Sequence, residues 1–217
     1  MIFRSMLLFL LLICMNRSIA FDTTIVTQLL HRIVQLQVKE NGVFPKGLFP
    51  SYRTYVLNQD RQKADINPFF TGLIVFTLDR IKDQLTPYQQ KLVEQISSNA
   101  KPVFTKFKNR KGRDTYNFWP TDTAQIFPNS GWMNLFNKSQ SLPDDMDDTV
   151  ITLMALNANE KTANNIHLLM QEYINGGKGK INNTLPSLSH LPAYSVWFGE
   201  KMPVDFDISV LSNVLYF

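Results

Sequence analysis

Hydrophobic residues along this chain recur at helical spacing, and segments that are apolar on most sides alternate with segments that are apolar on one side. Residues 69–78 are apolar nearly all round, which is typical of a helix buried on most sides. The segment 86–109 is more polar and opens with a Thr-Pro pair, a helix cap followed by the residue favoured at the first helical position. A buried segment at 144–156 and an amphipathic one at 160–177 repeat this order. The pattern predicts antiparallel helical hairpins in an all-α fold.

Two further helices and one strand are predicted outside these hairpins. Four apolar side chains lie near one face of a first helix: Ile25, Leu29, Ile33 and Leu36. An extended loop follows, with a short strand around residues 53–57. The segment 194–217 gives an aromatic stretch, an Asp pair and a new apolar helix.

Three apolar segments begin alike, with an acidic residue, one spacer and then Asp or Asn. The matched pairs are Asp65/Asn67, Asp145/Asp147 and Asp205/Asp207. They follow one another at offsets of 80 and 60 residues, and each has an aromatic lead-in, at 52–55, 116–119 and 194–198. This recurrence fits a divergent repeat of helical hairpins with insertions in the loops.

The first twenty residues are typical of a secretory signal peptide. Arg4 precedes an apolar core of about ten residues, and the segment ends in the small-x-small pattern Ser18-Ile19-Ala20. Cleavage after Ala20 would leave residues 21–217 as one helical domain, either periplasmic or secreted. The apolar core is too short to span a bilayer, and Asp, Asn and Gly interrupt the later apolar stretches. No stable membrane span is therefore predicted after signal removal.

Removing the signal changes what the composition implies. The full chain has 22 basic and 18 acidic residues, and Arg4 and Arg17 leave with the signal, so the formal charge falls from +4 to +2. Nothing in this balance indicates nucleic-acid binding. The single cysteine, Cys14, also lies in the signal, so no disulfide is available and stability must come from packing.

The alternation of buried and amphipathic helices, with acidic turns at the buried starts, resembles the α/α-toroid of the terpenoid cyclase and prenyltransferase superfamily. The segment Asp145-Met146-Asp147-Asp148-Thr149 is similar to the D-x-D-D-T motif of squalene–hopene-type cyclases. In that family the middle aspartate protonates an alkene or epoxide. The resemblance implies that Asp147 is the catalytic acid and that Asp145 and Asp148 support it.

The resemblance covers the chain from about residue 65 onward and departs from the family in two ways. The family's Gln-Trp repeats are absent, and a full ring of hairpins needs more chain than this one has. We therefore expect an α/α-toroid or an incomplete arc of one. Either the chain is the front part of a longer protein, or another chain completes the ring.

Two other roles explain the acidic turn. Asp is a preferred N-cap, so capping accounts for Asp147 and for Asp145. Asp144 and Asp148 have no counterpart in the other repeats, and crowded like charges raise the pKa of at least one carboxyl group. The spacing Asp144-Asp145-x-x-Asp148 is also that of a magnesium motif in class I prenyl-diphosphate enzymes, whose second motif is absent here. No metal and no cofactor is predicted.

Aromatic residues of the lead-ins are the candidates for substrate contact. Trp119, Trp197 and Tyr194 would line the mouth of a toroid beside the acidic turns, where aromatic faces stabilise carbocations or stack on sugars. Each of them can equally fill the core beneath a short loop. The basic segment 106–113 suits an anion, a lipid headgroup or an acidic glycan, or is a solvated loop.

The sequence supports two classes of function. The first is an exported terpenoid-cyclase-like protein that protonates or binds an apolar small molecule. The second is a toroid that binds a glycan, lipid or protein without catalysis, or a carbohydrate-active toroid with paired carboxylates as acid and base. The enzyme classes require that the acidic turn does not simply point into open solvent.

Overall fold

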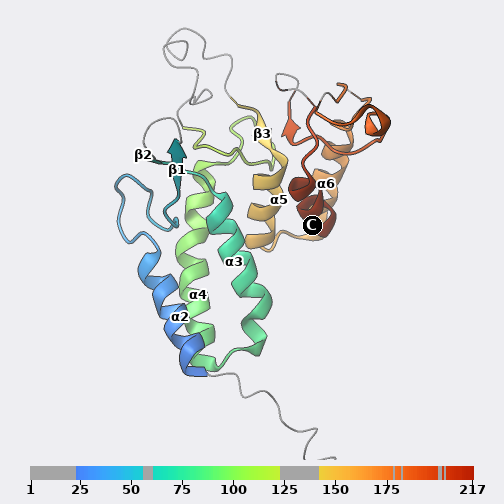
Figure 1. Ribbon diagram of the computed structural model, residues 1–217. Coiled ribbons are helices and arrows are strands. Elements are labelled where there is room, and N and C mark those ends of the chain that lie inside the picture. The colour runs from blue at the N-terminus through green and yellow to red at the C-terminus, as the bar shows by residue number, and fades with distance from the viewer. Residues whose placement is uncertain are drawn as a thin grey trace, which may run out of the picture.

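The computed structural model describes residues 23–55, 61–122, 142–177, 179–181, 183–199, 202 and 204–217 (Figure 1). The predicted signal peptide, residues 1–20, lies outside these residues. Within them the chain forms six α-helices: α2 (Thr23–Leu36), α3 (Phe69–Ile81), α4 (Pro87–Ala100), α5 (Met146–Ala155), α6 (Glu160–Gln171) and α7 (Ile208–Tyr216). Short 3₁₀ helices are η2 (Lys82–Gln84), η3 (Lys101–Lys106) and η6 (Pro186–Leu188). None of the described helices is long and apolar enough to cross a membrane.

Two small antiparallel sheets accompany the helices. They pair β1 (Tyr52–Tyr55) with β2 (Arg61–Ala64), and β3 (Asp144–Asp145) with β4 (Trp197–Phe198). The short strand predicted around residues 53–57 is present as β1, whereas β2, β3 and β4 were not predicted. The fold is therefore mostly helical, as predicted, with two sheets that an all-α prediction misses.

The hairpin predicted from α3 to α4 is confirmed. α4 begins at the predicted Thr-Pro pair: Thr86 Oγ1 accepts from the N–H of Gln89, and Gln89 Oε1 accepts from the N–H of Thr86. The two helices are antiparallel. Lys82 Nζ, just past the end of α3, lies 2.8 Å from Glu94 Oε1, and one turn earlier in α3 Asp79 Oδ1 accepts from Ser97 Oγ, which lies one turn later in α4.

α3 and α5 lie side by side and run in the same direction (Figure 1). Gly72 in the first half of α3 contacts Ile151 in the middle of α5, and a Cβ atom on Gly72 would lie only 2.7 Å from Ile151 Cγ2. Near the ends of the two helices, Asn157 Nδ2 donates to Asp79 Oδ2. α5 also packs against α7. The starts of α3 and α5 therefore lie at the same end of the molecule.

We expect Gly72→Ala to destabilise the protein, because the added methyl group would force α3 and α5 apart. A net loss of about 1–3 kcal/mol in the free energy of unfolding is expected from overpacking, measured by urea denaturation. Gly42→Ala is the control, since a Cβ atom at Gly42 meets nothing within 4 Å. Adding Ile151→Leu, which removes the Cγ2 branch, should restore part of the loss. Equal stabilities for the two alanine variants would contradict the close packing of α3 on α5.

The apolar faces of α2 and α3 differ from the prediction. α2 runs parallel to α4, with Gln89 Nε2 donating to Thr27 Oγ1, and it buries Leu30 rather than the predicted face. The exposed apolar side chains of α2 are Ile25, Leu29 and Leu36. α3 buries Val75 and Leu78 as expected but exposes Phe70 and Leu73. α2 carries apolar residues on two sides, and its packing on α4 decides which side is covered.

Candidate functional site

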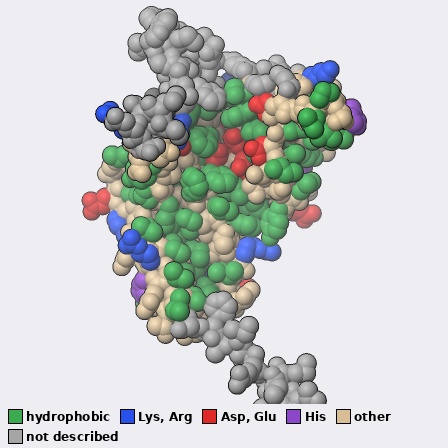
Figure 2. All heavy atoms as spheres, in the orientation of Figure 1, with side chains coloured by type: hydrophobic (Ala, Val, Ile, Leu, Met, Phe, Trp, Pro, Cys, Tyr) green, Lys and Arg blue, Asp and Glu red, His purple; other side chains and the backbone are tan. Residues whose placement is uncertain are grey.

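The acidic turn, residues 144–148, lies where α5 begins. Backbone hydrogen bonds join it to two of the three aromatic lead-ins, 116–119 and 194–198. Asp145 in β3 pairs with Trp197 in β4, and the N–H of Asp145 donates to Tyr116 O at 2.9 Å. The extended backbone of Asp145 turns directly into the first residue of α5, Met146. Figure 2 shows acidic side chains gathered on one face of the molecule, over the region where α5 begins in Figure 1 and among hydrophobic side chains.

The N-cap of α5 is Asp145. Its Oδ1 accepts from the N–H of Asp147 at 2.7 Å and from the N–H of Asp148 at 3.1 Å. Capping by Asp145 is therefore confirmed, whereas capping by Asp147 is wrong, because Asp147 lies inside the first turn. In α7 the residue matched to Asp147, Asp207, is the cap.

The other matched residue, Asn67, also has no capping role. The N-cap of α3 is Pro68, with no side-chain bond, and Asn67 instead donates its amide N–H to Asp65 Oδ2 and to Ser51 Oγ. The repeated acidic pair is thus used differently at each of the three helix starts.

Asp144 and Asp148, the two carboxylates without counterparts in the repeats, are both buried but differ in their hydrogen bonds. Asp144 is buried, and its Oδ2 accepts from Asn109 Nδ2 and Thr115 Oγ1, each at 2.5 Å. Asp148 is 2% exposed, and its Oδ1 accepts no hydrogen bond from the described residues. Among the described side chains, no group of three or more His, Cys, Asp or Glu is arranged to hold a metal ion.

Three carboxyl groups of this turn, those of Asp145, Asp147 and Asp148, hold their protons more tightly than ordinary aspartates. Burial, opposed by the N–H groups of Asp148 and Asp147 and supported by the charges of Asp147 and Asp207, raises the pKa of Asp145 to about 7. Burial, together with the charges of Asp145, Asp147 and Asp65, raises the pKa of Asp148 well above its usual value. Since Asp145 and Asp148 lie close together, they titrate as a pair and carry fewer than two charges near neutral pH.

Asp147 is the half-buried member of the turn. Its Oδ1 accepts from Asn213 Nδ2 of α7 at 2.7 Å. Burial raises the pKa of Asp147, the hydrogen bond from Asn213 lowers it, and the charge of Asp207 raises it, with a net upward shift. Of the three predicted catalytic residues, Asp147 is therefore the one with access to a ligand.

Asp65, shortly before α3, is a fifth carboxylate of this region and lies outside the motif. It forms an ion pair with Arg53 of β1, with 2.5 Å between Nη2 and Oδ1, and accepts from Trp119 Nε1 at 3.2 Å. The Arg53 guanidinium lies 5.1 Å from the centre of the Trp119 ring. The signal that placed Asp65 here was its match to Asp145 in the repeat.

The three predicted substrate-contacting aromatics have different places. Trp119 is buried and serves as a hydrogen-bond donor to Asp65. Trp197 is half-buried and is paired through its backbone with Asp145. Tyr194 packs against the core and pairs with Ile174 after α6. Of the three, Trp197 is the one whose backbone pairs directly with a residue of the acidic turn. Contact of any of the three with a substrate stays a prediction.

We expect Trp119→Phe to cost about 1–3 kcal/mol in the free energy of unfolding, because a buried carboxylate loses a hydrogen-bond donor. Trp197→Phe is the matched control, since its ring is half-buried and only its backbone pairs with Asp145. Thermal unfolding of both variants measures the difference. A smaller loss for Trp119→Phe than for Trp197→Phe would contradict a supporting role for the indole N–H.

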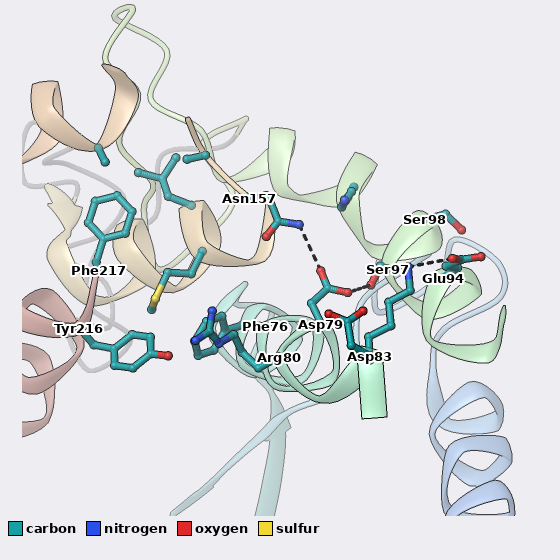
Figure 3. A pocket seen from close by; sticks show the side chains of 16 residues that line it. Phe76, Asp79, Arg80, Asp83, Glu94, Ser97, Ser98, Asn157, Tyr216 and Phe217 are labelled. Atoms are coloured by element: carbon teal, nitrogen blue, oxygen red, sulfur yellow. Dashed lines mark hydrogen bonds and ion pairs between the residues drawn. The ribbon is translucent and has the colours of Figure 1, made fainter. Parts of the chain in front are cut away.

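A cavity of about 670 Å³ lies away from the acidic turn, between the C-terminal ends of α3 and α5 (Figure 3). Phe76, Tyr216 and Phe217 line one side of it. On the other side Asp79 accepts from Ser97 and Asn157, and Lys82 pairs with Glu94. None of the acidic-turn residues lines this cavity. Two of its charged groups, Lys82 and Glu94, bind each other, and Asp79 is hydrogen-bonded to neutral side chains.

Comparison with protein-family models, with curated proteins and with solved structures finds no match to this chain. The function must therefore be argued from the geometry of the acidic turn.

Proposed function

We propose that the start of α5 is the general-acid site of an exported, terpenoid-cyclase-like protein, and that Asp147 protonates an apolar substrate there. The observation that carries this proposal is the burial of neighbouring carboxyl groups at the start of α5. Three carboxyl groups within four residues all have raised pKa values, and one of them is buried with no donor to its Oδ1 among the described residues. A carboxyl group that stays neutral near pH 7 is what a general acid requires.

The three carboxyl groups have different roles in this proposal. Asp145 is fixed by two backbone N–H groups and holds the turn in shape. Asp148 is the buried group whose raised pKa keeps the turn from carrying its full charge. Asp147 gives its proton to a carbon of the substrate double bond, whose electron pair forms the new C–H bond. This leaves a carboxylate and a carbocation.

The same proposal interprets the helices as an incomplete arc of an α/α-toroid. α3, α5 and α7 would form its inner row, and α2, α4 and α6 its outer row. The parallel course of α3 and α5 and the contact of α5 with α7 support this interpretation. So does the closeness of the acidic residues that precede the three inner helices, since the charges of Asp65 and Asp207 act on the α5 turn.

A non-catalytic toroid that binds a lipid, glycan or protein is the second candidate. The observation that favours it is the exposed apolar surface of the inner helices, with Phe70 and Leu73 on α3 and Ile208 and Leu215 on α7. Figure 2 shows hydrophobic side chains over much of the face on which the acidic side chains gather. A surface of this kind is typical of a binding site.

The test is turnover of a linear polyprene by the purified protein in D₂O. A product formed by alkene protonation carries a solvent deuterium, which mass spectrometry detects. Binding of the polyprene without a deuterated product would favour the second candidate instead. The carbohydrate-active alternative is tested in parallel with oligosaccharides as substrates.

A further inference from the structure

The geometry points to Asn213 of α7 as the residue that positions the carboxyl group of Asp147. Asn213 Nδ2 donates to Asp147 Oδ1 at 2.7 Å, across 66 residues of sequence. The bond joins the first turn of α5 to the second turn of α7. The proposed acid site is therefore built from two helices rather than from the D-x-D-D-T segment alone.

The identity of residue 213 is unusual for its place in the repeat. The residues six positions after the matched Asn67, Asp147 and Asp207 are Leu73, Leu153 and Asn213. Leucine therefore stands at this position in two inner helices, and an amide replaces it in the third. Asn213 is half-buried beside the buried Val210 and Val214, so a polar side chain is tolerated there. The structure shows where this side chain is used, because its amide donates to Asp147.

The amide determines how the proton sits on Asp147. A carboxylic acid has one carbonyl oxygen and one hydroxyl oxygen, and the carbonyl oxygen is the better acceptor for an N–H donor. Because Asn213 occupies Oδ1, the acid proton of Asp147 belongs on Oδ2. The amide is a neutral donor, so it remains in place when Asp147 has lost its proton.

The charged groups around Asp147 are carboxylates. Asp145 and Asp148 interact with it from its own helix, and Asp207 does so from the start of α7. Asp65 from α3 acts on the neighbouring Asp148. Burial and Asp207 raise the pKa of Asp147, and the Asn213 hydrogen bond lowers it. Asn213 is thus the group that keeps this carboxyl able to release its proton.

The positioning of Asp147 is tested without any substrate. In Asn213→Leu and in the nearly isosteric Asn213→Asp, the Asp147 carboxyl loses its donor. Its titration midpoint should move upward, followed by the carboxyl ¹³C signal against pH and assigned through Asp147→Asn. Asn164→Leu and Asn164→Asp, at an exposed position of α6, are the matched controls and should leave the midpoint unchanged. An Asp147 titration that is the same in the parent and both Asn213 variants overturns the inference.

The effect on proton donation rests on the proposed acid function and is measured separately. Misplacement of the acid proton should lower deuterated product formation by about tenfold or more, since general acids contribute about 10²–10⁴ to rates. The expected pH profile of the remaining activity follows the displaced Asp147 midpoint. If the parent forms no product but the midpoint moves, the positioning stands and the acid function fails. If the parent is active and the midpoint stays, the positioning fails alone.

Discussion

Replacing Asp148 with asparagine should raise the stability of the protein at pH 8 and flatten the dependence of its stability on pH. Asp148 is buried, accepts nothing at Oδ1 from the described residues, and faces the charges of Asp145, Asp147 and Asp65. The amide of asparagine cannot carry the charge of Asp148. Asp145 then has one like-charged neighbour fewer and ionises at lower pH. We expect a gain of about 1–3 kcal/mol in the free energy of unfolding at pH 8, after the cost of an imperfectly bonded amide.

The sign of the pH dependence follows from the raised pKa values. The pKa of Asp145 is about 7 in the folded protein and 3.8 as the reference value. Below the reference value both states hold the proton, so the stability contribution is fully present. This contribution is lost as pH rises towards 7. The whole loss is about 4 kcal/mol at about 1.4 kcal/mol per pKa unit, and it belongs to Asp145 and Asp148 together, because the two titrate as a pair. Urea denaturation at pH 5 and pH 8 measures the part lost above pH 5, about 2.7 kcal/mol for about two pKa units.

The exposed carboxylate Asp83 provides the control for this pH effect. Asp83→Asn should leave the difference between pH 5 and pH 8 unchanged, because Asp83 lies in η2, beyond the end of α3 that is away from the acidic turn. A parent protein whose stability rises from pH 5 to pH 8 would contradict the proposed protonation of the turn. So would an Asp148→Asn variant that loses stability at pH 8.

Local spacing was sufficient to predict the carboxylates of the acidic turn as a group. Asp145, Asp147 and Asp148 lie within one helical turn, so no tertiary information is needed to place them together. The repeat added Asp65 and Asp207, and their charges do act on the α5 turn. With Asp147 as its cap α5 would begin two residues too late, whereas the other predicted cap, Asp145, gives the observed start. Pairing of β3 with β4 holds Asp145 extended, so that the helix begins immediately after it.

Sequence spacing could not predict hydrogen bonds between residues that are distant in the sequence. The bond from Trp119 to Asp65 spans 54 residues, and the bond from Asn213 to Asp147 spans 66. Both depend on how separate elements pack and on which way the side chains point. The buried face of α2 failed for the same reason, because periodicity identifies an apolar stripe but not the neighbour that covers it. The contrast between a helix buried on most sides and an amphipathic one is confirmed for α5 and α6, since burial along a whole helix averages over such details.

The packing contacts of α5 with α3 differ in kind from the acidic turn at the start of α5. The close contact of Gly72 with Ile151 and the bond from Asn157 to Asp79 belong to packing and leave no unsatisfied carboxylate. At the start of the helix, burial places charges where packing alone would not put them. Stability lost there is compatible with a functional site, because groups tuned for proton transfer are held in surroundings that disfavour their charged form.

Asp147→Asn should abolish proton donation while leaving the fold intact. Asparagine keeps the oxygen that accepts from Asn213 but has no acidic proton, so deuterated product formation from a linear polyprene in D₂O should fall by about 10²–10⁴. Stability should change little, because Asp145 rather than Asp147 caps α5. Thermal unfolding and mass spectrometry of the product measure the two effects on the same preparation.

Two variants make this result specific to Asp147. Asp83→Asn, which removes an exposed carboxylate, should retain the parental rate. Asp148→Asn keeps the Asp147 proton donor but alters the charge beside it, so its product formation should fall less and its optimum should move to lower pH, as Asp147 then has one like charge fewer beside it. Parental activity in Asp147→Asn would exclude it as the acid. Complete loss in Asp148→Asn with activity kept in Asp147→Asn would transfer the acid role to Asp148.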